Sequence, residues 1–246
     1  MARPFTNNFG DNMLQVQVPG VIGGMGPQAT IEFLQRVAAR TGGGLEQDQL
    51  RLLVDQNPKI PNRHEAISSG YDTVSPVLLA MGRGLRAAGA DFLVVPCNTA
   101  HAFVALLTQE LDIPLLSVID CVKRRIEDDY GRVSIGLMAA DGCLISEIYQ
   151  KALNDTAKEV ITLSTDSQAE FMRLVYRVKA GEVSTDLTQS ALELFSELVD
   201  RGSEVLIAGC TEIPLMMGGS SYPLPCIDTL DVLVEATVER AYAGAN

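Results

Sequence analysis

Short apolar runs alternate with longer amphipathic segments along the whole chain. Eight runs have the length and composition of β-strands: residues 18–22, 52–55, 92–95, 115–118, 133–137, 160–163, 205–208 and 224–227. Apolar residues recur at helical spacing between them, most clearly in residues 30–40, 74–88, 170–180 and 185–201. Strands that alternate with helices predict an α/β fold with doubly wound parallel sheets.

The second half of the chain repeats the pattern of the first. Residues 85–97 match residues 198–210 at a constant offset of 113 positions, and the same offset carries residues 22–23 onto residues 135–136. We therefore expect two similar lobes related by a pseudo-twofold axis, with the active site between them.

This division predicts the boundaries of the lobes. Residues 18–118 form the first lobe, which carries Cys97, and residues 119–227 form the second, which carries Cys210. Residues 1–17 are interpreted as an amino-terminal extension. Residues 228–246 are expected to form a C-terminal helix that packs back on the first lobe.

Each lobe carries one cysteine just past a strand. Because the carboxyl ends of parallel strands open into the ligand crevice, Cys97 and Cys210 would approach one ligand from opposite sides. Free cysteines are often small buried core residues, but the matched placement favours chemistry. We expect the helix that follows each strand to lower the thiol pKa and to bind a carboxylate. Asn98, Thr99 and Thr211 add side-chain donors.

Two opposed thiols can invert a carbon centre. A thiolate on one face removes the α-proton of an amino acid, and a thiol on the other face delivers a proton. No lysine lies in a recognisable pyridoxal-phosphate context, so we expect a racemase that uses no cofactor and no metal. Glu212 is expected to orient Thr211 or to cap a helix, and His101 to be a satisfied polar residue on a helix.

Composition narrows the alternatives. The net charge of −12 argues against nucleic-acid partners, and no apolar stretch is long enough for a membrane span. The first twenty residues carry no secretory pattern. The five cysteines are widely spaced without a Cys-x-x-Cys motif, which disfavours disulfides and zinc and favours the cytoplasm. Gly24-x-Gly26-x-x-Ala29 with Asp55 also matches a dinucleotide fingerprint, so a nicotinamide-dependent oxidoreductase stays an alternative.

From Val21 to its end the chain resembles the aspartate/glutamate racemase superfamily, most closely the aspartate racemase branch. Five segments carry this resemblance: Gly-Gly-Met-Gly-Pro at 23–27 with Ala-Thr at 29–30, Asn-Pro-Lys-Ile-Pro-Asn-Arg at 57–63, Cys-Asn-Thr-Ala-His-Ala-Phe at 97–103, Val-Lys-Ala-Gly at 178–181 and Ala-Gly-Cys-Thr-Glu at 208–212. One departure stands out, because the branch commonly has Ile-Pro-Asp-Arg-Thr where this chain has Ile-Pro-Asn-Arg-His at 60–64.

The resemblance implies a set of roles. Cys97 and Cys210 would be the catalytic pair, while Arg63 and Lys179 would engage the carboxylates of the substrate. Asn98, Thr99, Thr211 and Met25 would support binding of the substrate. The resemblance further implies a homodimer and an acidic amino acid as substrate, with aspartate ahead of glutamate. A broad-specificity amino-acid racemase, a maleate isomerase and a hydantoin racemase remain the nearest alternatives.

Overall fold

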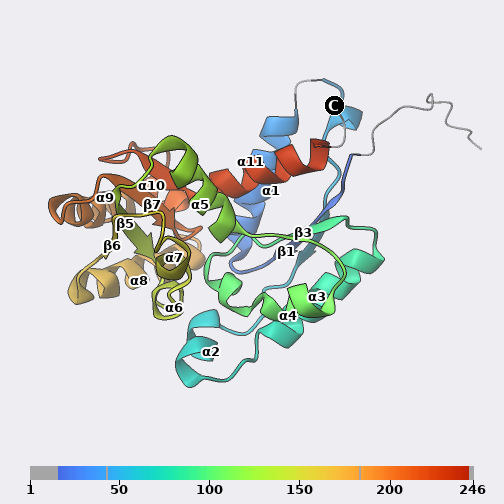
Figure 1. Cartoon of the computed structure of the whole chain (residues 1–246), viewed down its shortest axis with the longest axis horizontal. Coiled ribbons are helices and arrows are strands. Elements are labelled where there is room, and N and C mark those ends of the chain that lie inside the picture. The colour runs from blue at the N-terminus through green and yellow to red at the C-terminus, as the bar shows by residue number, and fades with distance from the viewer. Residues whose placement is uncertain (1–15, 43, 183, 244–246) are drawn as a thin grey trace, which may run out of the picture.

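The structure, a computed structural model, describes residues 16–42, 44–182 and 184–243 (Figure 1). Most of the predicted extension, residues 1–15, and the last three residues of the predicted C-terminal segment lie outside that description. No helix in the described ranges has both the length and the apolar composition that crossing a membrane requires.

Two four-stranded parallel sheets form the framework. The first has the order β2-β1-β3-β4 and the second the order β6-β5-β7-β8, so the two halves share one topology. The strands are β1 (Pro19–Gly23), β2 (Leu53–Gln56), β3 (Phe92–Val94), β4 (Leu115–Leu116), β5 (Ser134–Ala139), β6 (Glu159–Thr162), β7 (Val205–Gly209) and β8 (Cys226–Asp228). This arrangement confirms the predicted α/β fold with two similar lobes.

Helices flank both sheets. They are α1 (Pro27–Thr41), α2 (Arg63–Ser69), α3 (Ser75–Ala87), α4 (Ala105–Glu110), α5 (Val118–Asp129), α6 (Asp141–Ile145), α7 (Ile148–Ala152), α8 (Thr165–Lys179), α9 (Thr185–Asp200), α10 (Ile213–Met217) and α11 (Thr229–Tyr242), with 3-10 turns η1 (Glu46–Asp48) and η2 (Thr99–Phe103). Pro27 begins α1, where its missing N–H costs nothing. The side chains of Ser117 and Asp228 cap α5 and α11, the two helices that follow the last strand of each sheet.

The predicted offset of 113 positions matches β3 with β7, but the first strands of the two lobes, β1 and β5, match at a different offset. In the sheets Pro19 pairs with Phe92, whereas Ile135 pairs with Val205, so the first strands of the two halves correspond at an offset of 116 rather than 113. The structural counterpart of Gly136 is therefore Gly20, and the predicted match of residues 22–23 with 135–136 is wrong by three positions.

The packing around these two glycines explains the true register. A Cβ on Gly20 would lie 2.8 Å from Ala90 Cβ, and one on Gly136 would lie 2.6 Å from Ser203 Oγ. Ala90 and Ser203 precede β3 and β7 at the same position of the repeat. Each lobe thus has a glycine on its first strand at a position where a larger side chain would collide with the residue that precedes the third strand.

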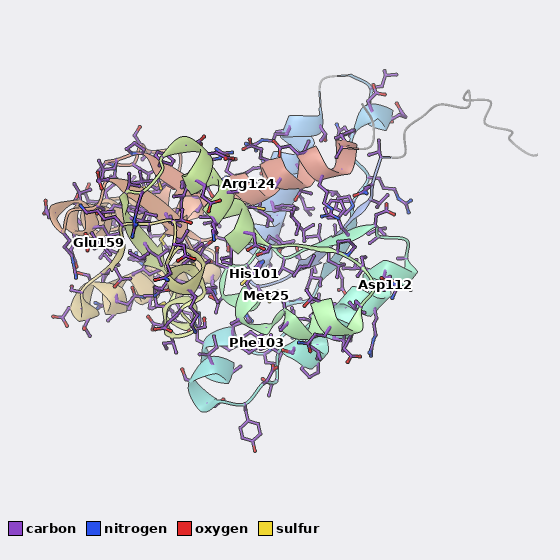
Figure 2. All side chains as sticks on the ribbon, viewed as in Figure 1. Met25, His101, Phe103, Asp112, Arg124 and Glu159 are labelled. Carbon is purple, nitrogen blue, oxygen red and sulfur yellow. The ribbon has the colours of Figure 1, made fainter. Side chains whose placement is uncertain are left out.

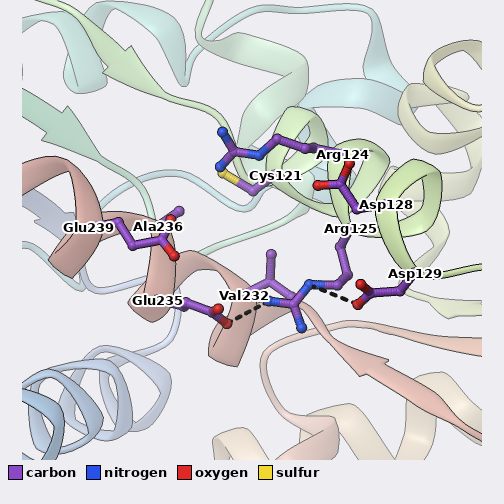
Figure 3. A pocket seen from close by; sticks show the side chains of 9 residues that line it. All are labelled: Cys121, Arg124, Arg125, Asp128, Asp129, Val232, Glu235, Ala236 and Glu239. Atoms are coloured by element: carbon purple, nitrogen blue, oxygen red, sulfur yellow. Dashed lines mark hydrogen bonds and ion pairs between the residues drawn. The ribbon is translucent and has the colours of Figure 1, made fainter. Parts of the chain in front are cut away.

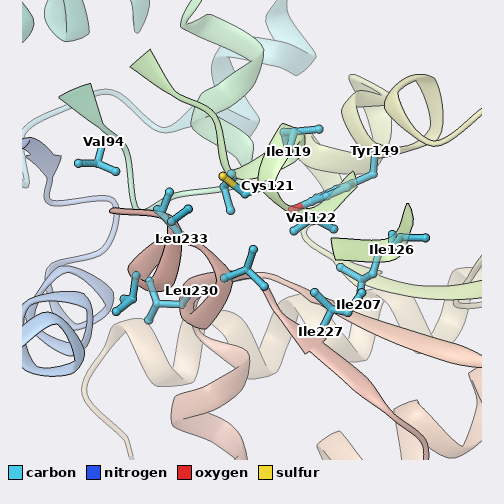
Figure 4. Packing of buried hydrophobic residues seen from close by; sticks show 14 of the residues in the cluster. Val94, Ile119, Cys121, Val122, Ile126, Tyr149, Ile207, Ile227, Leu230 and Leu233 are labelled. Carbon is cyan, nitrogen blue, oxygen red and sulfur yellow. The ribbon is translucent and has the colours of Figure 1, made fainter. Parts of the chain in front are cut away.

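The core between the lobes is apolar and continuous. Residues of β3 alternate between two clusters: Phe92 and Val94 face the central one, while Leu93 faces the outer cluster of the first lobe. Figure 4 shows Val94 of the first sheet and Ile207 of the second beside residues of α5 and α11 in the central cluster. Because α11 contacts both α1 and α5, it joins the two halves (Figure 1).

Candidate active site

One small cavity lies between the lobes at the carboxyl ends of β3 and β7. All eight predicted site residues line it, and His64, Ala140, Gly209 and Glu212 complete its wall. The volume left for the centre of a water molecule is about 10 Å³, which is room for a single water. Figure 2 places Met25, one lining residue, near the middle of the molecule.

The two cysteines hold matching positions in this cavity. Cys97 follows β3 and Cys210 follows β7 directly, and their exposed fractions are 7% and 6%. The first loop reaches the same place through Gly24, whose φ is +99° and whose missing Cβ would lie 2.4 Å from the carbonyl carbon of Asn57. Only glycine fits there, because the backbone is left-handed and the next loop is in contact.

Cys210 is surrounded by charge. Its Sγ donates to Glu212 Oε2 at 3.0 Å, and Lys179 Nζ lies 3.8 Å from Glu212 Oε1. Burial raises the pKa of the Cys210 thiol well above its ordinary value, and the Glu212 carboxylate raises it further, with Lys179 opposing only in part. The expectation that a helix amino terminus lowers this pKa is wrong, because α10 begins only at Ile213 and a full negative charge lies in between.

Lys179 is the last residue of α8, from where its side chain reaches the cavity. Burial lowers the pKa of its ammonium group, but Glu212, Cys210 and Cys97 outweigh that cause and the pKa is raised overall. The side chain therefore keeps its positive charge beside both cysteines.

Arg63 is the first residue of α2, in the first lobe, and also lines the cavity. Its Nη1 donates to Pro61 O at 2.8 Å and to Ile60 O at 3.3 Å, and these bonds anchor the guanidinium. An arginine carries five N–H donors, so the anchored group still has donors for a carboxylate.

Asn98 connects the lobes instead of standing free as a donor. Its Nδ2 donates to Thr229 Oγ1 at 3.0 Å, and its Oδ1 accepts from Tyr149 OH at 2.5 Å. Thr229 in turn donates to Ala208 O at 2.9 Å. The predicted binding residue thus belongs to a buried polar chain that reaches α7, β7 and α11. Sequence reasoning missed Tyr149, which looks like any other core aromatic.

The two histidines differ in their surroundings. His101 is 8% exposed and fully satisfied as expected, with Nδ1 2.9 Å from Cys97 O and Nε2 accepting from the Val118 N–H at 3.2 Å. His64 was not predicted as a site residue, yet it lines the cavity and accepts from the Gly142 N–H. Its position directly after Arg63, a predicted site residue, was a usable signal.

A larger cavity of about 540 Å³ lies between α5 and α11 (Figure 3). Ion pairs of Arg125 with Glu235 at 2.5 Å and with Asp129 at 3.4 Å line it. Cys121 lies at its wall, and burial raises the pKa of that thiol to about 11. No second cysteine of the described chain lines this cavity, so it cannot offer two thiols to one carbon.

Within residues 16–42, 44–182 and 184–243, no three His, Cys, Asp or Glu side chains converge as a metal ion would require.

Two matched α/β lobes that meet at one cavity, with a cysteine from each, define a two-lobed protein with a paired-thiol site. Residues 22–237 match the Asp/Glu/hydantoin racemase family, and the chain belongs to that family. Membership in this family supports an isomerase that acts on amino acids.

Individual relatives have low sequence identity to this chain but align with half of it or more. The broad specificity amino-acid racemase RacX of Bacillus subtilis is 24% identical over 228 residues, which are 91% of this chain and 98% of that protein. A glutamate racemase of Methylococcus capsulatus is 26% identical over 142 residues, 57% of this chain and 51% of that protein. The structure of the Picrophilus torridus aspartate racemase superposes with a TM-score of 0.77 at 24% identity, covering 92% of this chain and 94% of that one.

Proposed function

We propose that this protein is a cofactor-independent racemase of an acidic amino acid, with aspartate ahead of glutamate, that uses Cys97 and Cys210 as a pair. The observation that carries the proposal is the shared cavity, which both cysteines line from the ends of equivalent strands, β3 and β7. Arg63 and Lys179 line the same cavity and offset the negative charge of the chain at that place.

In the proposed reaction one sulfur lies on each side of the α-carbon. Cys210 starts as the thiol, because burial and Glu212 disfavour its thiolate. The α-C–H bond breaks toward the sulfur of Cys97 and leaves a carbanion, and a new C–H bond then forms from the Cys210 thiol. The reaction leaves a thiol on Cys97 and a thiolate on Cys210. Exchange of protons with water restores the starting state, and the opposite enantiomer reacts with the form that has the two roles exchanged.

The carbanion between the two sulfurs needs stabilisation that is in place beforehand. Arg63 and Lys179 are fixed cations that bind carboxylate oxygens, and the hydroxyls of Thr99 and Thr211 line the same wall. Such groups act strongly in a closed cavity, because little water is present to screen them.

One observation favours a second candidate, a racemase of broad specificity. Lys179 pairs with Glu212, so Arg63 is the one lining cation of the described residues that has no carboxylate beside it. RacX, named for broad specificity, also aligns with nearly the whole chain. A chiral assay of the purified protein with L-aspartate, L-glutamate and several neutral amino acids separates the two candidates, since only a selective enzyme turns over the acidic pair much faster.

Isotope exchange tests the two-thiol mechanism. In deuterated water, product made from either enantiomer of aspartate should carry deuterium at the α-carbon, while substrate recovered early should carry much less. Cys97→Ser and Cys210→Ser should each lower turnover by about 10²–10⁴-fold, the usual contribution of a general acid or base. Cys226→Ser, on β8 and away from the cavity, is the matched control. Near-native racemisation by either of the first two variants would refute the pair.

A further inference from the structure

His64 belongs to the first lobe but contacts the second. It lies in the first turn of α2, and its Nδ1 accepts a hydrogen bond of 3.0 Å from the backbone N–H of Gly142 on α6. A Cβ on Gly142 would lie 2.8 Å from His64 Nδ1 and 2.8 Å from Thr99 Cγ2. The close approach of α6 to the imidazole therefore depends on a glycine.

This contact determines where the imidazole carries its proton. An acceptor Nδ1 has no hydrogen, so the neutral ring carries its hydrogen on Nε2. In the described part of the chain, no protein group forms a hydrogen bond with His64 Nε2, and His64 lines the cavity. The ring thus offers one N–H donor that the protein itself leaves unused.

The groups around the ring keep it neutral. Burial, Lys179 and Arg63 lower the pKa of His64 to about 4, against the opposing charges of Asp141 and Glu212. A neutral ring adds a directional donor to the cavity without adding another charge.

The place of α2 indicates that this donor faces a substituent of the reacting carbon and not that carbon itself. The reacting carbon must lie between the two sulfurs, which come from β3 and β7. Of the residues on α2, Arg63 and His64 line the cavity, so this helix faces a substituent of that carbon.

We propose that the Nε2–H of His64 donates a hydrogen bond to the side-chain carboxylate of the substrate and, beside Arg63, selects acidic amino acids. This inference rests on the proposed racemase function and adds to it a specificity-determining residue.

Two isosteric substitutions separate this role from the contact with Gly142. His64→Asn places an amide oxygen near the position of Nδ1, which keeps an acceptor for Gly142 but removes the donor at Nε2. His64→Gln places an amide nitrogen near the position of Nε2, which keeps the donor but removes the acceptor. Glu65→Gln, an exposed change on the same helix, is the control.

The kinetic test compares aspartate with alanine. Losing one hydrogen bond to a charged group should lower kcat/KM of the asparagine variant for aspartate, relative to alanine, by about ten- to a hundredfold. The glutamine variant should keep the preference of the wild type. If the histidine only joined the lobes, the glutamine variant would be the impaired one and both substrates would suffer equally. That result would overturn the inference.

A binding measurement keeps the inference testable apart from turnover. The chain has two histidines, and their backbone contacts impose opposite tautomers, with the hydrogen on Nε2 of His64 and on Nδ1 of His101. In ¹⁵N NMR of the histidine-labelled protein, the ring signals absent from His64→Asn belong to His64. Aspartate at its D/L equilibrium should shift the Nε2 signal of His64, whereas alanine should not.

Together, the kinetic and the NMR measurements distinguish a failure of the proposed racemase function from a failure of the proposed role of His64. A protein that binds aspartate at His64 but racemises no amino acid would refute the proposed function and leave the binding role standing. A protein that racemises aspartate while the His64 signal stays in place, and whose asparagine variant keeps its preference, would refute the role of His64 alone.

Discussion

Glu212→Gln tests whether the carboxylate beside Cys210 holds the proton on that thiol. Glutamine keeps the shape of the side chain and an acceptor oxygen but removes the negative charge. Two unit charges about 4 Å apart interact by about 4 kcal/mol at an effective dielectric constant near 20, equivalent to about 3 pKa units. In the protein the Cys210–Glu212 contact is 3.0 Å, and Lys179 at 3.8 Å from the other carboxylate oxygen cancels part of the charge. We therefore expect the pKa of Cys210 to fall by about one to two units.

Alkylation measures this pKa directly. The rate at which iodoacetamide labels Cys210 follows the thiolate fraction, so its dependence on pH gives the pKa. Mass spectrometry of the proteolytic peptides separates Cys210 from the other four cysteines, and Cys226 serves as an internal reference. Glu193→Gln removes the same charge from an exposed position on α9 and should leave the Cys210 profile unchanged.

The reasoning fails if the labelling profile of Cys210 in the Glu212→Gln variant coincides with that of the wild type, or moves to higher pH. Either result would mean that burial alone sets the pKa, and that the carboxylate does not decide which cysteine starts as the thiol.

Two further predictions concern charge and acid stability. Arg63→Ala should lower kcat/KM for aspartate by about tenfold, equivalent to about 1.4 kcal/mol, and should affect kcat/KM for alanine much less. An equal loss for both substrates would contradict selection by this residue. Arg132→Ala, a change at an exposed position before β5, is the control for net charge. Burial, Lys179 and Arg63 lower the pKa of His64 from 6.5 to about 4, so the unfolded state takes up its proton first and stability should fall as the pH drops below 6.5. Denaturant melts between pH 6.5 and 5 should show this loss, and His64→Asn should show less of it; an equal slope in the variant would contradict the assignment.

The inner strands β1, β3, β5 and β7 could be predicted because they are buried along their whole length, which makes each of them a compact apolar run. The predicted ends of two strands differ from the observed ends, because a helix cap or a proline lies there. Residues 115–118 were predicted as one strand, but β4 ends at Leu116 because the Ser117 hydroxyl accepts from the Asp120 N–H and starts α5. Likewise β8 begins at Cys226, after Pro225, which has no N–H for the ladder although its carbonyl accepts from the Leu206 N–H at 2.9 Å.

The residues of the site could be predicted as a group, but their pairings could not. Residue type and position in the repeat identified Cys97 and Cys210, which the structure brings to one cavity. The bond between Tyr149 and Asn98 joins residues 51 positions apart, and that between His64 and Gly142 spans 78 positions. Such contacts depend on how the lobes close on each other, which no local pattern encodes.

The near-symmetry of the two lobes is broken beside the two cysteines. At the repeat offset that superposes Cys97 on Cys210, Thr99 corresponds to Glu212. The hydroxyl and the carboxylate hold equivalent positions in two similar strand-to-helix turns, and both line the cavity. A racemase with two identical thiol environments would have no preference for which sulfur holds the proton, whereas the proposed mechanism needs one thiol and one thiolate at the start. A carboxylate beside only one of the two cysteines makes that cysteine the one that holds the proton, and it leaves the positions of the two sulfurs unchanged.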